Sequence, residues 1–242
     1  MHISKPYTDA GTLVVNIVNP TAGLLSGDHI DCTVRVETGA RLLLVTPSAN
    51  RAHRMKNGRA SVDQKYSVAG NAALENWPEL FIPQGAASYL QKTRIDVTPG
   101  GELMFWELLA PGRVASGEVF QYSDLDWSTH VFLDERLILR ERYRLVPGEP
   151  SVEVWRAQFP TGYYASGIVI APSLSGGSPI WRQIHDLHNE NAWIGCSELC
   201  SGGASIRLLA RDSITLRKTL EEIRRLLYAA LDRPAPRLRR AG

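Results

Sequence analysis

The stretch His29-Ile-Asp-Cys-Thr-Val-Arg-Val36 and the run that follows it, Arg41-Leu-Leu-Leu-Val-Thr46, decide the fold class. Apolar and polar residues alternate in the first stretch, which is the period of a strand with one buried face. The second stretch is short and largely apolar, as in a strand that is covered on both faces. Gly39 between them marks a turn. Together they predict two successive strands, the second of them in the interior.

Similar runs, separated by glycine and proline, continue through the first two-thirds of the chain. Further strands are predicted over residues 61–68, 72–77, 89–97, 102–109, 125–133, 136–145, 151–159 and 166–171. The runs on either side of Pro99-Gly-Gly101, and those on either side of Asp134-Glu135, are each predicted to pair as a hairpin. Strands at this spacing favour a mainly β fold of stacked, twisted sheets, similar to a broad β-helix or a sandwich.

Helical patterns enter near the C-terminus. Ser178-Pro179 has the order of a helix start, and this helix is predicted to reach about Asn189. A strand is predicted over 204–210 and a second helix over 216–231. The apolar stripe of that second helix consists of Leu216, Leu220, Ile223, Leu227 and Leu231.

The chain shows no obvious linker, so one domain of residues 1–242 is predicted. It would have a β-rich part (1–171), a helix-strand-helix end (178–232) and a mobile basic tail (233–242).

The composition is that of an ordinary globular protein, with 44% hydrophobic and 21% charged residues. A net charge of +2 argues against a nucleic-acid groove. No apolar run has membrane-spanning length, and the first residues lack the apolar core of a signal peptide. Three cysteines are too few for a secreted disulfide scaffold. The expected compartment is therefore the reducing cytoplasm.

No phosphate loop, nucleophile elbow or His-Glu-x-x-His helix occurs in the sequence, which favours a binding or assembly role. Four carboxylates are candidates for chemistry: Asp28, Glu107, Glu118 and Glu141. The ordinary interpretation is a turn for Asp28 and surface ion pairs for the others. The alternative is a water-filled interior passage lined by acids, because a buried carboxylate needs water, a cation or arginine nearby.

Two weaker patterns involve other residue types. His185 and His188 share a predicted helix face, and with Cys196 and Cys200 they offer the four ligands of a zinc site. Free cysteines are, however, usually small core residues. Arg51 and Arg54 lie in a basic loop with Lys56 and Arg59, which is either a solvated face or a partner-docking surface.

Several stretches occur in the order seen in one known family. They are Asn19-Pro-Thr-Ala-Gly-Leu-Leu-Ser-Gly-Asp28, residues 39–51 with Arg54, residues 73–79, residues 105–118, the pair Glu141-Arg142, and residues 206–210 with the last helix. Together they resemble the UreD (UreH) family of urease accessory proteins. Compared with that family, the chain is expected to be short at its N-terminus and somewhat divergent.

The resemblance implies a metallochaperone scaffold, without a reaction of its own, that is required to load nickel into apo-urease. Its partners would be UreF, the GTPase UreG and the apo-urease subunits, with a homodimer forming through UreF, and neither nucleic acid nor a membrane. No cofactor would be tightly bound, and Ni²⁺ would pass transiently.

The resemblance also assigns roles to residues. Asp28 and Glu141 would be acids of an interior tunnel, and Glu107 and Glu118 would be further ones. Arg142 would be the counter-charge that keeps Glu141 ionised.

Two other functions remain open. The first is a β-rich hydrolase that uses two of the four carboxylates as acid and base, which requires the pair to lie roughly 5–10 Å apart. The second is an interaction module stabilised by zinc at the histidines and cysteines named above.

Overall fold

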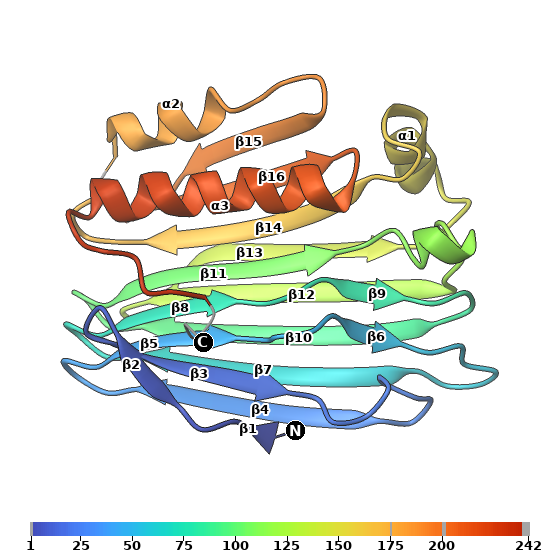
Figure 1. Ribbon diagram of the computed structural model, residues 1–242, viewed down its shortest axis with the longest axis horizontal. Coiled ribbons are helices and arrows are strands. Elements are labelled where there is room, and N and C mark those ends of the chain that lie inside the picture. Colours follow the sequence, from blue (N-terminus) through green and yellow to red (C-terminus); the bar gives the residue numbers. More distant parts are fainter. Residues whose placement is uncertain (1, 175, 200–201, 239–242) are drawn as a thin grey trace.

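Two β-sheets packed face to face make up most of the protein, whose computed structural model describes residues 2–174, 176–199 and 202–238 (Figure 1). The larger sheet contains β1 (His2–Ile3), β2 (Tyr7–Asp9), β3 (Thr12–Val18), β5 (Arg41–Val45), β6 (Asn50–Ala52), β8 (Ala73–Trp77), β9 (Phe81–Pro83), β11 (Glu102–Leu109), β14 (Tyr163–Ile170), β15 (Ala192–Glu198) and β16 (Ala204–Ala210). The smaller sheet contains β4 (His29–Val36), β7 (Ala60–Val68), β10 (Ser88–Val97), β12 (Asp124–Leu133) and β13 (Arg136–Leu145). The predicted mainly β fold of stacked sheets is confirmed.

The chain winds between the two sheets like a broad coil. From β3 to β12 the long strands alternate between the larger and the smaller sheet, and neighbours within each sheet run parallel. Equivalent positions therefore stack in rows, of which Leu13, Leu42, Leu74 and Leu103 form one. Such rows matter for function, because residues far apart in the sequence occupy adjacent places on one face of a sheet.

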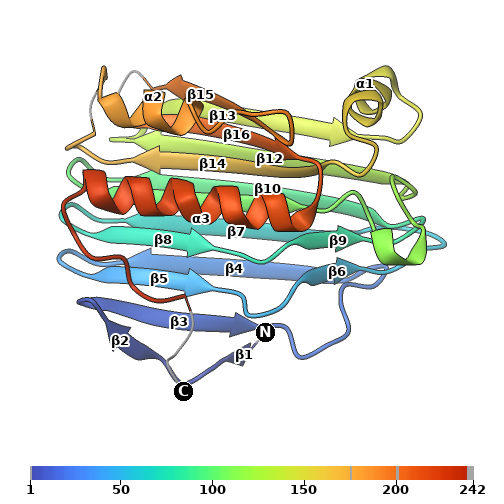
Figure 2. The ribbon, with the colours of Figure 1, turned by 45° about the horizontal axis from the view of Figure 1, so that its top comes forward.

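The helices lie outside this coil. They are η1 (Val114–Ser116), α1 (Pro150–Gln158), α2 (Pro179–His185) and α3 (Ser213–Ala230). Figure 2 shows α2 and α3 covering the outer face of the larger sheet. Four residues of the predicted α3 stripe are buried there in one cluster with residues of β11, β14 and β16, and the fifth, Leu231, is partly buried. The two helices expected near the C-terminus are confirmed, but α2 ends at His185 and not at about Asn189. The Asp212 carboxylate accepts a hydrogen bond from the backbone N–H of Thr215 at 2.7 Å and caps α3, which begins earlier than predicted.

The strand predicted over 151–159 is wrong, because this segment is the helix α1. Pro150 occupies the first turn of the helix, where its fixed φ and missing N–H cost nothing. Val152 is fully buried whereas Val154 is 67% exposed, so the two valines that resembled a strand face lie on different sides of the helix.

The hairpin predicted around Pro99-Gly-Gly101 is also wrong. The two strands exist, but β10 pairs with β7 and β12 while β11 pairs with β8 and β14. The turn therefore carries the chain from one sheet to the other. A Cβ on Gly101 would lie 2.8 Å from the Ala69 carbonyl oxygen, so glycine is needed where the turn touches the preceding coil. The hairpin of β12 and β13 is confirmed, and Asp134 and Glu135 both have positive φ, as a tight two-residue turn requires.

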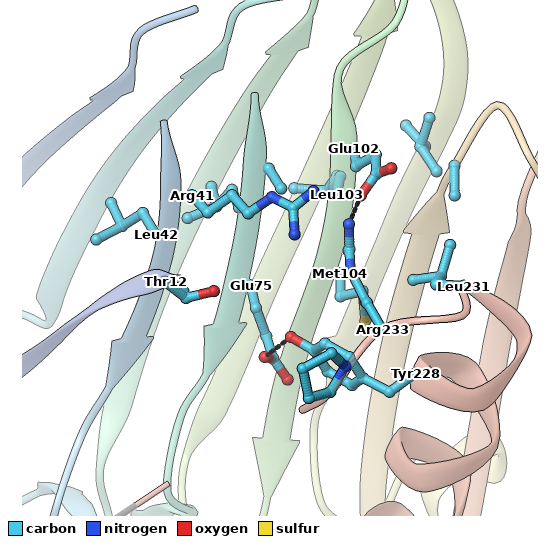
Figure 3. A pocket seen from close by; sticks show the side chains of 15 residues that line it. Thr12, Arg41, Leu42, Glu75, Glu102, Leu103, Met104, Tyr228, Leu231 and Arg233 are labelled. Atoms are coloured by element: carbon cyan, nitrogen blue, oxygen red, sulfur yellow. Dashed lines mark hydrogen bonds and ion pairs between the residues drawn. The ribbon is translucent and has the colours of Figure 1, made fainter. Parts of the chain in front are cut away.

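The basic tail, predicted to be mobile from residue 233, is bound to the larger sheet as far as residue 238. Arg233 forms an ion pair with Glu102 (Figure 3). The backbone N–H of Arg237 donates to the Asp9 carboxylate at 2.7 Å. Leu238 packs beside the buried residues of β3 and β5. Residues 239–242 lie outside the described part. No helix among the described residues has both the length and the apolar character needed to cross a bilayer.

Candidate functional site

A row of polar side chains crosses the inner face of the smaller sheet. The pairing of β4, β7, β10, β12 and β13 places five residues at matched positions: Cys32, Gln64, Thr93, Thr129 and Glu141. Most neighbours on this face are core residues such as Val62, Tyr66 and Val131. Polar groups that point into a β core need hydrogen-bond partners, and for this row the larger sheet opposite can supply them.

A second polar row lies opposite, on the larger sheet. Glu107 on β11, Ser166 on β14 and Arg207 on β16 occupy matched positions. The two rows exchange hydrogen bonds across the interior. The Thr129 hydroxyl, which sits opposite Glu141 in the smaller sheet, donates to Glu107 at 3.3 Å. The Ser166 hydroxyl, which sits opposite Glu107 in the larger sheet, donates to Glu141 at 3.0 Å. The two carboxylates are therefore neighbours that share one polar network.

Glu107 is the more deeply buried of the pair, at 6% exposure. Its Oε1 atom accepts hydrogen bonds from Gln91 Nε2 at 2.7 Å and from Trp127 Nε1 at 3.0 Å. Burial, followed by the charge of Glu141, raises the pKa of Glu107 to about 7, against the opposing effect of its hydrogen bonds. Near neutral pH this carboxyl group can therefore take up or release a proton.

Glu141 is held by three groups from the larger sheet. Its Oε2 atom lies 2.7 Å from an Arg207 guanidinium nitrogen and accepts from Ser166, and its Oε1 atom accepts from the Tyr164 hydroxyl at 3.3 Å. The counter-charge of Glu141 is therefore Arg207, and the expectation that Arg142 fills this place is wrong. Arg142 points to the outer face, where it binds Asp126 at 2.8 and 3.0 Å. Successive residues of a strand face opposite sides, so Arg142 cannot share the side of Glu141.

The acid pair lies between two hollow regions. On the side of Glu107 is a cavity of about 110 Å³, whose lining includes Gln64, Gln91 and Trp127. On the side of Arg207 is a groove of about 550 Å³, whose lining includes Tyr164 and Trp193. The order across the molecule is thus cavity, Glu107, Glu141, Arg207, groove. The cavity has room for several water molecules and therefore for a hydrated ion.

The other two candidate acids, Asp28 and Glu118, make their hydrogen bonds outside the network of Glu107 and Glu141. The Asp28 carboxylate accepts from the Leu25 backbone N–H at 2.7 Å, which is the turn role expected of it. Its loop also contributes Asn19 and Leu24 to the cavity lining. Glu118 accepts from Arg113 Nε and from the Gly85 backbone N–H, both at 2.9 Å, and the Arg113 contact is the main cause that lowers the pKa of Glu118 to about 2. The tunnel roles of both acids stay predictions.

The proposed zinc ligands come together only in part. The rings of His185 and His188 stack with centroids 6.1 Å apart. Nδ1 of His188 is engaged by the Ile194 backbone N–H at 3.2 Å. Burial raises the pKa of Cys196 to about 11, which disfavours the thiolate that zinc requires, and Cys200 lies outside the described residues.

Two surface groups complete the set of candidates. Arg51 and Arg54 are exposed, and their docking role stays a prediction. His29, Asp31 and Asp63, which the sequence did not single out, have ligand atoms within 4.8 Å of one another. His29 Nε2 lies 3.1 Å from Asp31 and 3.8 Å from Asp63, an arrangement that an exposed ion-pair cluster accounts for. This group lies on the outer face of the smaller sheet and is separate from the acid pair.

The chain is similar to urease accessory proteins along almost its whole length. A match to the family described as UreD urease accessory protein spans residues 1–241. Urease accessory protein UreD of Opitutus terrae is 36% identical over 234 residues, which cover 96% of this chain and 86% of that protein. The UreD protein of Deinococcus radiodurans is 35% identical over 182 residues, or 73% of this chain and 64% of that protein. The UreD protein of Acetivibrio thermocellus is 27% identical over 238 residues, or 93% of this chain and 87% of that protein.

Proposed function

The chain belongs to the UreD family of urease accessory proteins, and on this basis we propose that it is a metallochaperone scaffold that passes nickel to apo-urease. The observation that carries the proposal is the position of Glu107 and Glu141 between an interior cavity and an opposite groove. Carboxylate and hydroxyl oxygens are weak, successive ligands for a divalent cation, and a route built from them does not trap its cargo.

The chemistry that we propose for this route is an exchange of charge. A Ni²⁺ ion in the cavity meets Glu107, whose raised pKa leaves it partly protonated near neutral pH. The ion displaces that proton to a water molecule of its hydration shell, and its positive charge compensates the carboxylate charge that burial otherwise penalises. The next oxygens along the polar network belong to Thr129, Ser166 and Glu141. Beyond them the groove opens to the surface, where the receiving protein would dock.

We propose that the protein has no reaction of its own and acts in the cytoplasm with UreF, the GTPase UreG and the apo-urease subunits. The hydrolase hypothesis has less support. Glu107 and Glu141 are neighbours, but the lining of the cavity includes only Glu107 of the two, and the lining of the groove includes neither. A general acid–base pair needs both groups to face a substrate.

The test is urease activation in a host that lacks this chain, complemented with wild type, Glu107→Gln or Glu141→Gln. Each variant should reduce urease activity at limiting nickel by at least about tenfold, because a neutral amide is a weaker metal ligand than a carboxylate. Asp126→Asn is the matched control, since this acid binds an arginine on the outer face and should support normal activation.

Pull-down of UreF and apo-urease on the same variants separates the two parts of the proposal. Retained association together with lost activation supports a transit role for the two acids. Full activation by both variants would contradict it. Failure of the wild-type chain to associate with UreF would contradict the scaffold role.

A further inference from the structure

Arg207 stands where the acid pair meets the groove. Its Nη2 atom lies 2.7 Å from Glu141, and its Nη1 atom donates to the Ile206 carbonyl oxygen at 2.9 Å. The side chain is 31% exposed and belongs to the groove lining, whereas the Glu141 side chain is 13% exposed. Arg207 is therefore the outermost member of the polar network, held on one side by a carboxylate and open on the other.

A guanidinium in this place competes with any cation that binds Glu141. An arginine is charged at every physiological pH, so the competition does not depend on protonation. A metal ion and a guanidinium cannot occupy the same oxygen at 2.7 Å, because their charges repel each other strongly at that distance. An ion can thus bind the Oε2 atom of Glu141 only when Arg207 moves away from that oxygen. Once bound, the ion is repelled by the guanidinium when it returns.

The structure provides somewhere for Arg207 to go. The groove of about 550 Å³ begins at this side chain and is lined by the aromatic rings of Tyr143, Trp155, Tyr164 and Trp193. A guanidinium stacks well on such faces. The Nη1 atom of Arg207 donates to backbone carbonyl oxygens. Among the described residues, Glu141 is the only carboxylate that Arg207 contacts.

We propose that Arg207 is a built-in competitor that keeps the nickel affinity of Glu141 low enough for the ion to be passed on. The inference rests on the proposed transit function and adds a residue that controls release. Arg207 is a positioning residue in this scheme, because it acts on the cargo through Glu141. Its removal should make the interior hold nickel more tightly and deliver it less well.

The experiment measures Ni²⁺ binding to the purified full chain by isothermal titration calorimetry, and urease activation in the complemented host. Arg207→Gln should bind Ni²⁺ on the order of tenfold more tightly than wild type, because a nearby positive charge is lost. Arg207→Lys keeps the charge but loses the planar fork, so its affinity should rise by a smaller factor, roughly threefold. Urease activation should fall in both variants, and it should fall further in Arg207→Gln, which binds Ni²⁺ more tightly, than in Arg207→Lys. Arg142→Gln is the matched control, since this neighbour of Glu141 faces outward and should change neither quantity.

A merely structural Arg207 predicts a different pattern. If Arg207 only neutralised Glu141, Arg207→Gln would bind Ni²⁺ no more tightly than wild type, and this result would overturn the inference. If Arg207→Gln does not fold, the order of affinities between Arg207→Lys and wild type decides, and equal affinity contradicts the proposal. The transit function is judged separately by Glu107→Gln and Glu141→Gln, so a failure there is distinguishable from a failure here.

Discussion

At the scale of single residues, the acid pair is defined by which face of a strand each side chain occupies. Glu141 and Arg142 are adjacent in sequence, yet one binds Arg207 inside the molecule and the other binds Asp126 outside. The alternation of a strand accounts for the difference. Glu107 stands out for another reason, because it is a carboxyl group in a region where only hydrogen bonds and a cation can compensate its charge.

This burial predicts a specific pH dependence of stability. The pKa of Glu107 rises from its ordinary value of 4.5 to about 7 on folding. The folded state therefore holds the proton more tightly, so the contribution of this group to stability is fully present below about pH 4.5 and is lost as the pH rises through about 7. The loss over this window is about 3 kcal/mol.

Urea unfolding of wild type and Glu107→Gln at pH 5 and pH 8 measures this contribution. Between these two pH values the wild type should lose roughly 2–3 kcal/mol more than the variant, in which position 107 cannot ionise. Parallel pH profiles would show that Glu107 does not carry the effect.

At the scale of elements, the larger sheet depends on close contact between β11 and β14. Gly167 lies opposite Trp106 in this pair, and a Cβ at position 167 would meet the Trp106 ring at 2.2 Å. Trp106 is 1% exposed and also packs edge-on against Trp77, so it has little freedom to shift. The absence of a side chain at Gly167 thus lets the Trp106 ring pack directly against the β14 backbone.

Gly167→Ala should therefore lower the free energy of unfolding by about 1–3 kcal/mol, the cost of overpacking in a dense core. Gly195→Ala is a fitting control, because Gly195 lies on a strand of the same sheet and an added Cβ would meet no atom within 4 Å. Thermal unfolding of the two variants compares them directly. Equal melting temperatures would mean that the tryptophan adjusts without cost.

At the scale of the whole molecule, one buried ion pair ties the C-terminal segment to the coil. Glu75 on β8 binds Arg224 of α3 at 2.5 and 2.9 Å and accepts from the Tyr228 hydroxyl at 2.6 Å. Arg224 also donates to the Pro236 carbonyl oxygen at 2.8 Å. The last helix and the middle of the larger sheet thus meet at the Glu75 carboxylate, and Arg224 joins the tail to them. Figure 3 shows the contact between Glu75 and Tyr228.

Glu75→Gln should destabilise the protein by about 3–5 kcal/mol, because it leaves Arg224 charged and buried without its partner. It should also loosen the tail, so that trypsin cleaves after Arg237 at lower concentration than in wild type. Glu222→Gln provides the comparison, since it removes an exposed ion pair within α3, worth only about 0.3–0.5 kcal/mol. A Glu75→Gln variant as stable as Glu222→Gln would contradict the assigned role.

The sequence by itself determined the local elements and the family. Period-two alternation predicts β4 at its observed bounds, and the strand predicted over 204–210 is β16. The apolar stripe predicts α3, because a helix repeats its face within a few residues. The prediction of a strand over 151–159 is wrong because Val152 and Val154, two residues apart, fit the pattern of a strand as well as that of a short helix. The acids Glu107 and Glu141 were named as candidates, but nothing local indicated that they were neighbours.

Only the tertiary structure decided which strands share a sheet and which side chains meet across the interior. The register that aligns Thr129 with Glu141, and Glu107 with Ser166 and Arg207, joins residues that are far apart in the chain. Such a register is set by the packing of whole sheets, and a shift of one residue would turn every side chain to the other face. The lone charge of Arg207 in an otherwise uncharged strand was visible in the sequence. The sequence does not show that its partner is Glu141, because only the distance between the two side chains in the folded protein determines which carboxylate pairs with Arg207.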